Sequence, residues 1–154
     1  MSSVHQNLSE IKNLPNGTGK KIGIVVSKWN DSITYALLEG AVNTLLSANV
    51  NREDILINEV PGTFELPFGA QRILKAKKLD AVICLGCVIQ GETRHFDFIC
   101  DATANGIMRV SLDNELPVIF GVLTTDTLQQ ALDRSGGLHG NKGVEAAATA
   151  LQLL

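Results

Sequence analysis

The residues best suited to chemistry gather in one segment, 85–98, which reads LGCVIQGETRHFDF. An apolar run stops at a glycine, a short polar loop follows, and His95 stands at the head of an amphipathic pattern. This is the order of a strand, a loop large enough for a phosphate, and a helix N-terminus. A helix N-terminus binds anions through unpaired backbone N–H groups and the positive end of its dipole. The segment therefore predicts an anion site with one acid/base group, His95, beside it.

The same segment has part of the pattern of a nucleotide-binding phosphate loop, G-x-x-x-x-G-K-[ST], since residues 86–93 read GCVIQGET. Glu92 stands at the lysine position, which removes the cation that nucleotide phosphates need. Nucleotide hydrolysis is therefore disfavoured, although the loop can still bind one phosphate through backbone N–H groups. His95 taken alone fits a surface histidine at a helix end equally well. Its place beside the loop favours a function.

Three other side chains allow two interpretations each. Trp29, the single tryptophan, follows an apolar run and can stack on a flat heterocycle or simply pack. Arg134 and Lys142 flank a glycine-rich stretch, where each can bind an anion or be an ordinary charge at a helix–helix turn. No spacing of residues points to a bound metal or to a nicotinamide cofactor.

The chain has three cysteines, an odd number that argues against a disulfide framework. Cys84 and Cys87 have the spacing C-x-x-C, but they lie in the run AVICLGCVI, which is typical of a strand. Side chains three residues apart in a strand point to opposite faces of the sheet. We therefore expect two separate buried thiols rather than a metal site or a disulfide.

The composition limits the partners of the chain. Its 154 residues suggest one domain, and the charged share of 19% is lower than the roughly 25% of an ordinary domain. We therefore expect subunit interfaces to cover part of the surface. The net charge is −3 and the largest basic cluster is Lys75, Lys77 and Lys78. This balance disfavours nucleic acids and acidic membranes as partners.

Nothing in the sequence indicates a membrane segment or a signal peptide. No apolar run approaches the roughly 18 residues that a transmembrane helix needs. The N-terminal stretch MSSVHQNLSEIKNL has neither a basic leader nor a continuous apolar core. We therefore expect a cytoplasmic protein without a membrane partner.

The elements that position these residues alternate regularly along the chain. Residues 1–20 are polar and rich in turn residues, and we expect an arm that precedes a single domain, 21–154. Ile/Val-rich runs predict strands at 21–28, 54–60, 81–89 and 117–123. Amphipathic segments predict helices after each strand. The residues expected to cap them are Asp31 or Ser32, Thr63, Thr125 or Asp126, and Asn141.

Strand–helix alternation predicts an α/β fold with a parallel sheet and helices on both of its faces. In such sheets ligands bind beyond the carboxyl ends of the strands. The four strand ends deliver residues 29–30, 61–65, 90–95 and 124–126 to that edge. Trp29 and His95 therefore fall on the same edge of the predicted sheet.

Five ordered blocks with matching spacings resemble the family of the 6,7-dimethyl-8-ribityllumazine synthases, from about Lys21 to the C-terminus. The blocks are GIVVSKWND, VPGTFELP, AVICLGCVIQGETRHFDF, PVIFGVLTTDTLQQALDRSG and GNKGVEAA. The resemblance implies a three-layer α/β/α sandwich with a four-stranded parallel sheet in flavodoxin-like order. It also implies that the N-terminal arm adds to the sheet of a neighbouring subunit.

The resemblance implies a condensation in riboflavin biosynthesis that joins 5-amino-6-(D-ribitylamino)uracil to 3,4-dihydroxy-2-butanone 4-phosphate. An amine attacks the ketone, a Schiff base forms, phosphate leaves, and the second amine closes the ring. The family needs no metal or organic cofactor. Much of the rate comes from holding the two small-molecule substrates together.

The resemblance also assigns site residues. His95 matches the proton-transfer residue, and Trp29 the aromatic position that stacks on the pyrimidine. Residues matching the pyrimidine and ribityl site are Thr63, Phe64 and Glu65, with ring contacts from the backbone of Cys87, Val88 and Ile89. The phosphate is expected on Glu92 and Thr93 N–H groups with Arg134 as a clamp, and Lys142 in a supporting role. Phe120 matches a ring contact donated by the neighbouring subunit.

Family members form homopentamers, and many assemble twelve pentamers into a hollow icosahedral shell of sixty subunits. The stretch from Arg134 to Lys142 carries no insertion, which favours the shell over free pentamers. Trp29 stands where phenylalanine is commoner, and its larger face can also hold a flavin. The alternative function is therefore a non-catalytic carrier of flavin or lumazine on the same scaffold. Retention of Glu65, His95 and Arg134 argues against that alternative.

Overall fold

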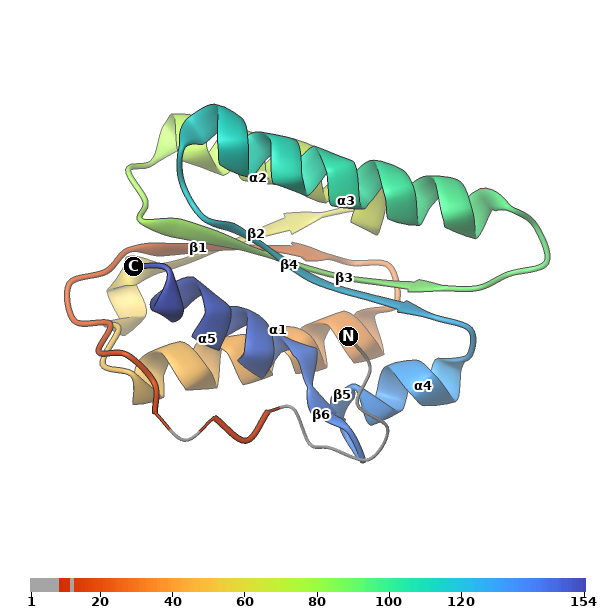
Figure 1. Ribbon diagram of the computed structural model, residues 1–154, viewed down its shortest axis with the longest axis horizontal. Coiled ribbons are helices and arrows are strands. Elements are labelled where there is room, and N and C mark those ends of the chain that lie inside the picture. The colour runs from red at the N-terminus through yellow and green to blue at the C-terminus, as the bar shows by residue number, and fades with distance from the viewer. Residues whose placement is uncertain (1–8, 12) are drawn as a thin grey trace.

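Runs rich in Ile, Val and Leu form four strands of one sheet, β1 (Ile22–Ser27), β2 (Ile55–Val60), β3 (Ala81–Ile89) and β4 (Val118–Thr125). The computed structural model describes residues 9–11 and 13–154 (Figure 1). All strand pairs of the sheet are parallel, and the order is β2-β1-β3-β4. The predicted four-stranded parallel sheet in flavodoxin-like order is therefore confirmed.

Helices cover both faces of the sheet (Figure 1). Helices α2 (Leu66–Ala76) and α3 (His95–Asn114) lie on one face. The other face carries α1 (Asp31–Ser47), α5 (Lys142–Gln152) and the short α4 (Leu128–Asp133). Two 3-10 turns, η1 (Arg52–Asp54) and η2 (Thr63–Glu65), flank β2. This arrangement is the three-layer sandwich that the sequence predicts.

The core divides into two apolar layers because side chains of a buried strand alternate between faces. Ile24 and Val26 of β1 pack with α1 and α5, whereas Val25 packs with α2 and α3. Cys87 belongs to the first layer and Cys84 to the second, and both thiols are free and buried. The prediction of two separate buried cysteines is therefore confirmed.

The helix starts are predicted less well than the strands. Asn141 caps α5, since its Oδ1 accepts the N–H groups of Gly143 at 2.8 Å and Val144 at 3.4 Å. The cap of α4 is Thr127, whose Oγ1 accepts the N–H of Gln130, so the expectation of Thr125 or Asp126 is wrong. Strand β4 runs on through Thr125 and delays that helix.

Two further caps differ from expectation. Helix α1 follows Asn30 in a left-handed conformation, so neither Asp31 nor Ser32 is its N-cap residue. Thr63 opens the turn η2 instead of capping α2, which begins three residues later at Leu66. Both differences arise in the short connections from strand to helix at the predicted ligand edge, residues 28–30 and 61–65.

The sequence does not predict the hairpin β5 (Ser135–Gly137) and β6 (Gly140–Asn141) between α4 and α5. The spacing of apolar residues in the sequence does not predict how much apolar surface remains exposed.

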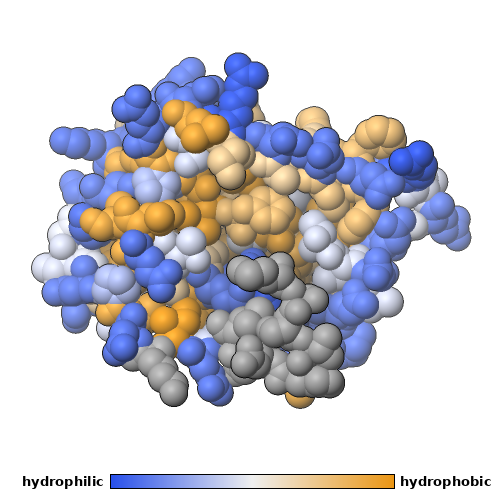
Figure 2. All heavy atoms as spheres, in the orientation of Figure 1, coloured by the Kyte–Doolittle hydropathy of each residue, from blue (hydrophilic) through white to orange (hydrophobic). Residues whose placement is uncertain are grey.

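The outer sides of α2 and α3 carry exposed apolar side chains, and one face of the molecule in Figure 2 shows apolar residues gathered at the surface. The exposed residues on these two helices include Phe68, Phe98, Met108 and Leu112.

The described part of the predicted arm, residues 9–11 and 13–20, forms no helix or strand. Its later half lies against its own chain, since Leu14 packs on the core and the Gly17 N–H donates to the Ala48 carbonyl at 2.7 Å. The predicted pairing of the arm with a neighbour's sheet stays a prediction, and residues 1–8 and 12 of the arm lie outside the described residues.

Candidate functional site

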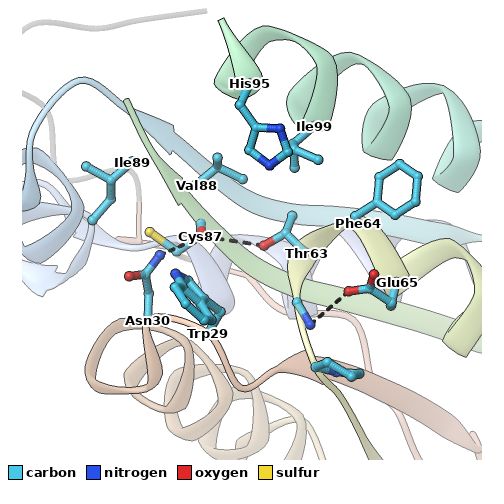
Figure 3. A pocket seen from close by; sticks show the side chains of 12 residues that line it. Trp29, Asn30, Thr63, Phe64, Glu65, Cys87, Val88, Ile89, His95 and Ile99 are labelled. Atoms are coloured by element: carbon cyan, nitrogen blue, oxygen red, sulfur yellow. Dashed lines mark hydrogen bonds between the residues drawn. The ribbon is translucent and has the colours of Figure 1, made fainter. Parts of the chain in front are cut away.

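A pocket of about 790 Å³ lies at the carboxyl ends of β1, β2 and β3 (Figure 3). The chain runs outward from β1 to β2 on one side and from β3 to β4 on the other, so the strand order reverses between β1 and β3. Such a reversal opens a crevice for ligands in parallel sheets. The lining residues are Trp29, Asn30, Pro61, Gly62, Thr63, Phe64, Glu65, Cys87, Val88, Ile89, His95 and Ile99.

Strand β3 extends beyond β1 and forms the floor of this crevice. The β1–β3 pairing ends at Val26 and Leu85, whereas the β3–β4 pairing continues to Ile89 and Thr125. Successive residues of a strand turn their peptide groups to alternate sides. Since the peptide groups of Cys87 face the β1 side of the strand, those of Ile89 face the same side. At this level β1 has ended, so no neighbouring strand pairs with them. The strand thus offers backbone donors and acceptors to the pocket.

The Cys87 carbonyl joins three walls of the pocket. It accepts a hydrogen bond from Asn30 Nδ2 at 3.0 Å and a longer one from Thr63 Oγ1 at 3.4 Å. Figure 3 shows the two side chains reaching it from opposite sides. The buried Thr63 also accepts at its own carbonyl from Thr103 Oγ1 of α3 at 3.4 Å. Beyond the end of β1, these side-chain hydrogen bonds take the place of strand pairing. They connect β3 to the segments that follow β1 and β2, and connect the latter to α3.

Two aromatic side chains stand exposed at the pocket. Trp29 keeps 74% of its surface exposed, and Phe64 keeps 55%. Trp29 is held through its backbone, because its N–H donates to the Pro61 carbonyl at 3.1 Å. Large aromatic rings left in water beside a pocket are well suited to stacking on a flat ligand.

Glu65 places a carboxylate at the pocket wall. Its Oε2 accepts the N–H of Gly62, the residue that precedes the turn η2, at 3.0 Å (Figure 3). This bond fixes the carboxylate, which is half-buried, and leaves acceptor capacity for ligand hydroxyl groups.

His95 enters the pocket from the first residue of α3, across from Trp29 (Figure 3). The helix has no side-chain cap, and the His95 N–H makes only a long 3.4 Å contact with Thr93 Oγ1. Arg94 turns to Asp97, with 3.4 Å between Nε and Oδ2, in an exposed ion pair. The predicted juxtaposition of an imidazole and an uncapped helix N-terminus is thus present, although Glu92 and Thr93 do not line the pocket itself.

Three predicted site residues lie elsewhere. Phe120 and Lys142 line a second pocket of about 410 Å³ between α3, β4 and α5. Arg134 lines neither pocket. It is linked to Lys142 through Glu145, whose carboxylate lies 2.7 Å from Arg134 Nη2 and 3.2 Å from Lys142 Nζ. The predicted residues therefore form two groups within one chain.

The comparison with known proteins shows the family to which this chain belongs. The family model described as 6,7-dimethyl-8-ribityllumazine synthase matches residues 19–154. The chain is 57% identical to the 6,7-dimethyl-8-ribityllumazine synthase of Cytophaga hutchinsonii over 155 residues, which cover 100% of this chain and 98% of that protein. The enzyme of the same name from Parabacteroides distasonis is 51% identical over 156 residues, with the same coverage. The chain belongs to the 6,7-dimethyl-8-ribityllumazine synthase family.

A third member of the lumazine synthase family, from Porphyromonas gingivalis, is 46% identical over 155 residues, with 99% of this chain and 96% of that protein covered. Since these relatives match along almost their whole length, the resemblance seen in the sequence blocks extends to the entire domain.

Four pocket residues of this lumazine synthase family member are not among the predicted site residues, although the first three lie on the strand ends predicted to reach the ligand edge. They are Asn30, Pro61, Gly62 and Ile99. Pro61 and Gly62 fall within the predicted strand end 61–65, but neither has a side chain that suggests chemistry. Asn30 lies next to Trp29, and an asparagine at the end of a strand is a recognisable signal for a left-handed turn.

The pocket thiol is not a nucleophile. Burial raises the pKa of Cys87 to about 11, so the thiol stays protonated at neutral pH. Among the described residues, no group of three or more His, Cys, Asp and Glu side chains is placed to hold a metal ion. In that same part of the chain no helix combines the length and apolarity needed to cross a membrane.

Proposed function

We propose that this pocket catalyses the condensation of 5-amino-6-(D-ribitylamino)uracil with 3,4-dihydroxy-2-butanone 4-phosphate to 6,7-dimethyl-8-ribityllumazine, phosphate and two molecules of water. The chain is a transferase of riboflavin biosynthesis by its family. One observation carries the assignment of the site. Trp29, the projecting end of β3, Glu65 and His95 line a single pocket at the point where the strand order reverses.

The pyrimidine substrate takes the wall between Trp29 and β3. Its flat ring stacks on the exposed indole, and its polar edge meets the backbone of Cys87, Val88 and Ile89. The ribityl chain lies along η2, where the fixed carboxylate of Glu65 accepts from hydroxyl groups. Thr63 supports this wall through its contact with the Cys87 carbonyl, and Phe64 flanks it.

The phosphate of the second substrate binds at the start of α3. Backbone N–H groups at Glu92 and Thr93 face the anion, with the positive end of the helix dipole behind them. The side chain of Glu92 points away from the anion in this proposal. Arg134 supplies the clamping charge, and Lys142 adds to the local positive potential.

His95 transfers protons between the two bound substrates. Attack of the substrate amine on the ketone produces a carbinolamine, and loss of water gives the Schiff base. Proton transfer by the imidazole assists this dehydration and the departure of phosphate. Loss of phosphate leaves an enol that tautomerises to a ketone. The second amine attacks this carbonyl and closes the ring with loss of a second water molecule. Most of the acceleration comes from holding the two substrates in reacting positions.

Phe120, Arg134 and Lys142 complete the site from a second copy of the chain. Their separation from the main pocket within one chain supports this arrangement, as does the partial exposure of Phe120. We infer a homopentamer in the cytoplasm, with twelve pentamers in a sixty-subunit shell. Residues 1–20 act as an arm that adds to a neighbour's sheet, for which the edge strand β2 and its exposed Ile57 offer a partner.

Mixing the purified protein with both substrates and recording the absorbance of the lumazine product tests the catalytic proposal. We expect the chromophore to appear only when both substrates are present. Absence of turnover together with intact flavin binding would replace the enzyme with the carrier function. Analytical ultracentrifugation tests the assembly separately, because a monomer would leave the site without Phe120, Arg134 and Lys142.

A further inference from the structure

Asn30 stands at a conformationally demanding position. Its backbone is left-handed, with φ 60° and ψ 47°, at the point where β1 passes into α1. Residues with a Cβ rarely adopt this region, and asparagine is among the few that tolerate it. This conformation reverses the chain within one residue. Asn30 lies between Trp29, two residues beyond the end of β1, and Asp31, the first residue of α1.

The residue is bonded on both sides. Its carbonyl accepts the N–H groups of Ile33 at 2.9 Å and Thr34 at 3.0 Å, which form the first turn of α1. Its side-chain Nδ2 donates to the Cys87 carbonyl at 3.0 Å, across 57 residues of sequence. The turn is therefore anchored to β3, the strand that forms the pocket floor.

Trp29 has little else to set its direction. Its indole keeps 74% of its surface exposed, so core packing does not hold it. Its backbone is fixed by the Pro61 carbonyl before the turn and by Asn30 after it. Figure 3 shows the indole and the Asn30 amide side by side below Cys87. The angle between the indole and the end of β3 thus depends on the bond from Asn30 to Cys87.

We propose that Asn30 is a positioning residue, whose bond to the Cys87 carbonyl holds the Trp29 indole parallel to the ring that binds on β3. The inference rests on the proposed function for its kinetic consequence, since the ring is that of the pyrimidine substrate. Its conformational part does not depend on turnover. Asn30 itself needs no contact with the reacting atoms.

Asn30→Gly is the decisive variant, because glycine keeps the left-handed backbone and removes only the amide. We expect the KM for the pyrimidine substrate to rise about 3- to 10-fold, the range for loss of one hydrogen bond. The KM for the butanone phosphate should stay within about 2-fold of the parent value. Asn30→Asp, which keeps the size but cannot donate when ionised, should shift the same constant in the same direction.

Trp29 also supplies a readout in the absence of substrate, because it is the only tryptophan of the chain. In Asn30→Gly we expect a larger fast component in the time-resolved fluorescence anisotropy, which reports free rotation of the indole. Asn49→Gly is the matched control, since Asn49 is also left-handed, with φ 67°, and lies exposed, outside the residues that line the pocket. That variant should leave both the anisotropy and the two KM values unchanged.

The outcomes separate the two proposals. If the parent protein forms no lumazine, the proposed function fails, and the anisotropy alone decides the role of Asn30. If the parent is active and Asn30→Gly keeps the parental anisotropy or the parental ratio of KM values, the positioning role is wrong. An equal rise of both KM values would also contradict it, because it would show a general loosening of the pocket.

Discussion

The Arg134 guanidinium lies 2.7 Å from the Glu145 carboxylate, and the two side chains keep only 21% and 14% of their surface exposed. Arg134 Nη1 also donates to the His139 carbonyl at 2.6 Å. An arginine held on two sides in this way loses little further freedom when it binds an anion. The geometry therefore suits a preformed clamp for a phosphate brought by a neighbouring subunit.

Replacing Arg134 by alanine tests the clamp. We expect the KM for the butanone phosphate to rise roughly 10- to 100-fold, as for loss of one charge-assisted hydrogen bond, with the KM for the pyrimidine nearly unchanged. Steady-state kinetics with each substrate varied in turn measures both constants. Arg109→Ala is the matched control, because Arg109 forms an exposed ion pair with Asp113 on α3. Equal weakening of both substrates would contradict a clamp.

Glu145→Gln tests what holds the clamp. The substitution keeps the size of the side chain and leaves Arg134 and Lys142 without their shared negative partner. Because the group is largely but not fully buried, we expect a loss of stability of about 2 kcal/mol, below the cost of breaking a fully buried pair. Urea unfolding measures it, with Asp113→Asn as the exposed control. A loss no larger than in the control would show that the pair does not stabilise the fold.

His95→Ala tests proton transfer. We expect kcat to fall roughly 100-fold, the lower end for one acid/base group, because binding of the substrates together still accelerates the reaction. Single-turnover measurements of lumazine formation give the rate. His139→Ala serves as the control, since His139 contacts Arg134 through its backbone oxygen, which the substitution retains. A parental rate in His95→Ala would remove the imidazole from the mechanism.

The strands and the ligand edge could be predicted from sequence because they depend on local composition. The Ile/Val runs that form β1 and β3 are buried on both faces, as a parallel sheet requires. The carboxyl ends of parallel strands must then meet at one edge, which brings Trp29, Glu65 and His95 together. These steps need no knowledge of contacts between distant residues.

The role of Asn30 could not be predicted in this way. Its partner, the Cys87 carbonyl, can accept from Asn30 because the pairing of β3 with β1 stops at Leu85, two residues before Cys87. The predicted cap of α4 is wrong for a related reason, since pairing with Ile89 extends β4 to Thr125. In both cases the deciding quantity is the relative length of two paired strands. Ile and Val content gives the ends of β2 and β3 correctly, at residues 60 and 89, but does not show how far pairing with β3 prolongs β4 beyond residue 123.

Gly143→Ala tests the packing of α5 against α1. A Cβ at this position would collide with the Leu37 carbonyl oxygen, a backbone atom that cannot move aside cheaply. We expect a loss of at least about 1–3 kcal/mol in unfolding free energy, the range for overpacking a core. Urea denaturation measures it. Gly91→Ala is the control, because a Cβ there meets no atom within 4 Å. Similar stability of the two variants would show that the helices can separate at no cost.

The buried thiols predict a loss of stability in alkali. Burial raises the pKa of Cys84 to about 12 and that of Cys87 to about 11, whereas the thiols of an unfolded chain have a pKa of about 8.5. The folded protein therefore keeps protons that the unfolded chain releases. This contribution is fully present below about pH 8.5 and is lost as the pH rises towards 11–12.

The unfolding free energy of the parent should fall more steeply between pH 9 and 11 than that of the Cys84→Ala/Cys87→Ala variant. All other titrating groups are common to both proteins, so urea titrations at several pH values isolate the thiols. Parallel curves would show that the two thiols titrate alike in the folded and unfolded states. Cys100→Ala should remove a smaller part of the slope, because Cys100 is only half-buried.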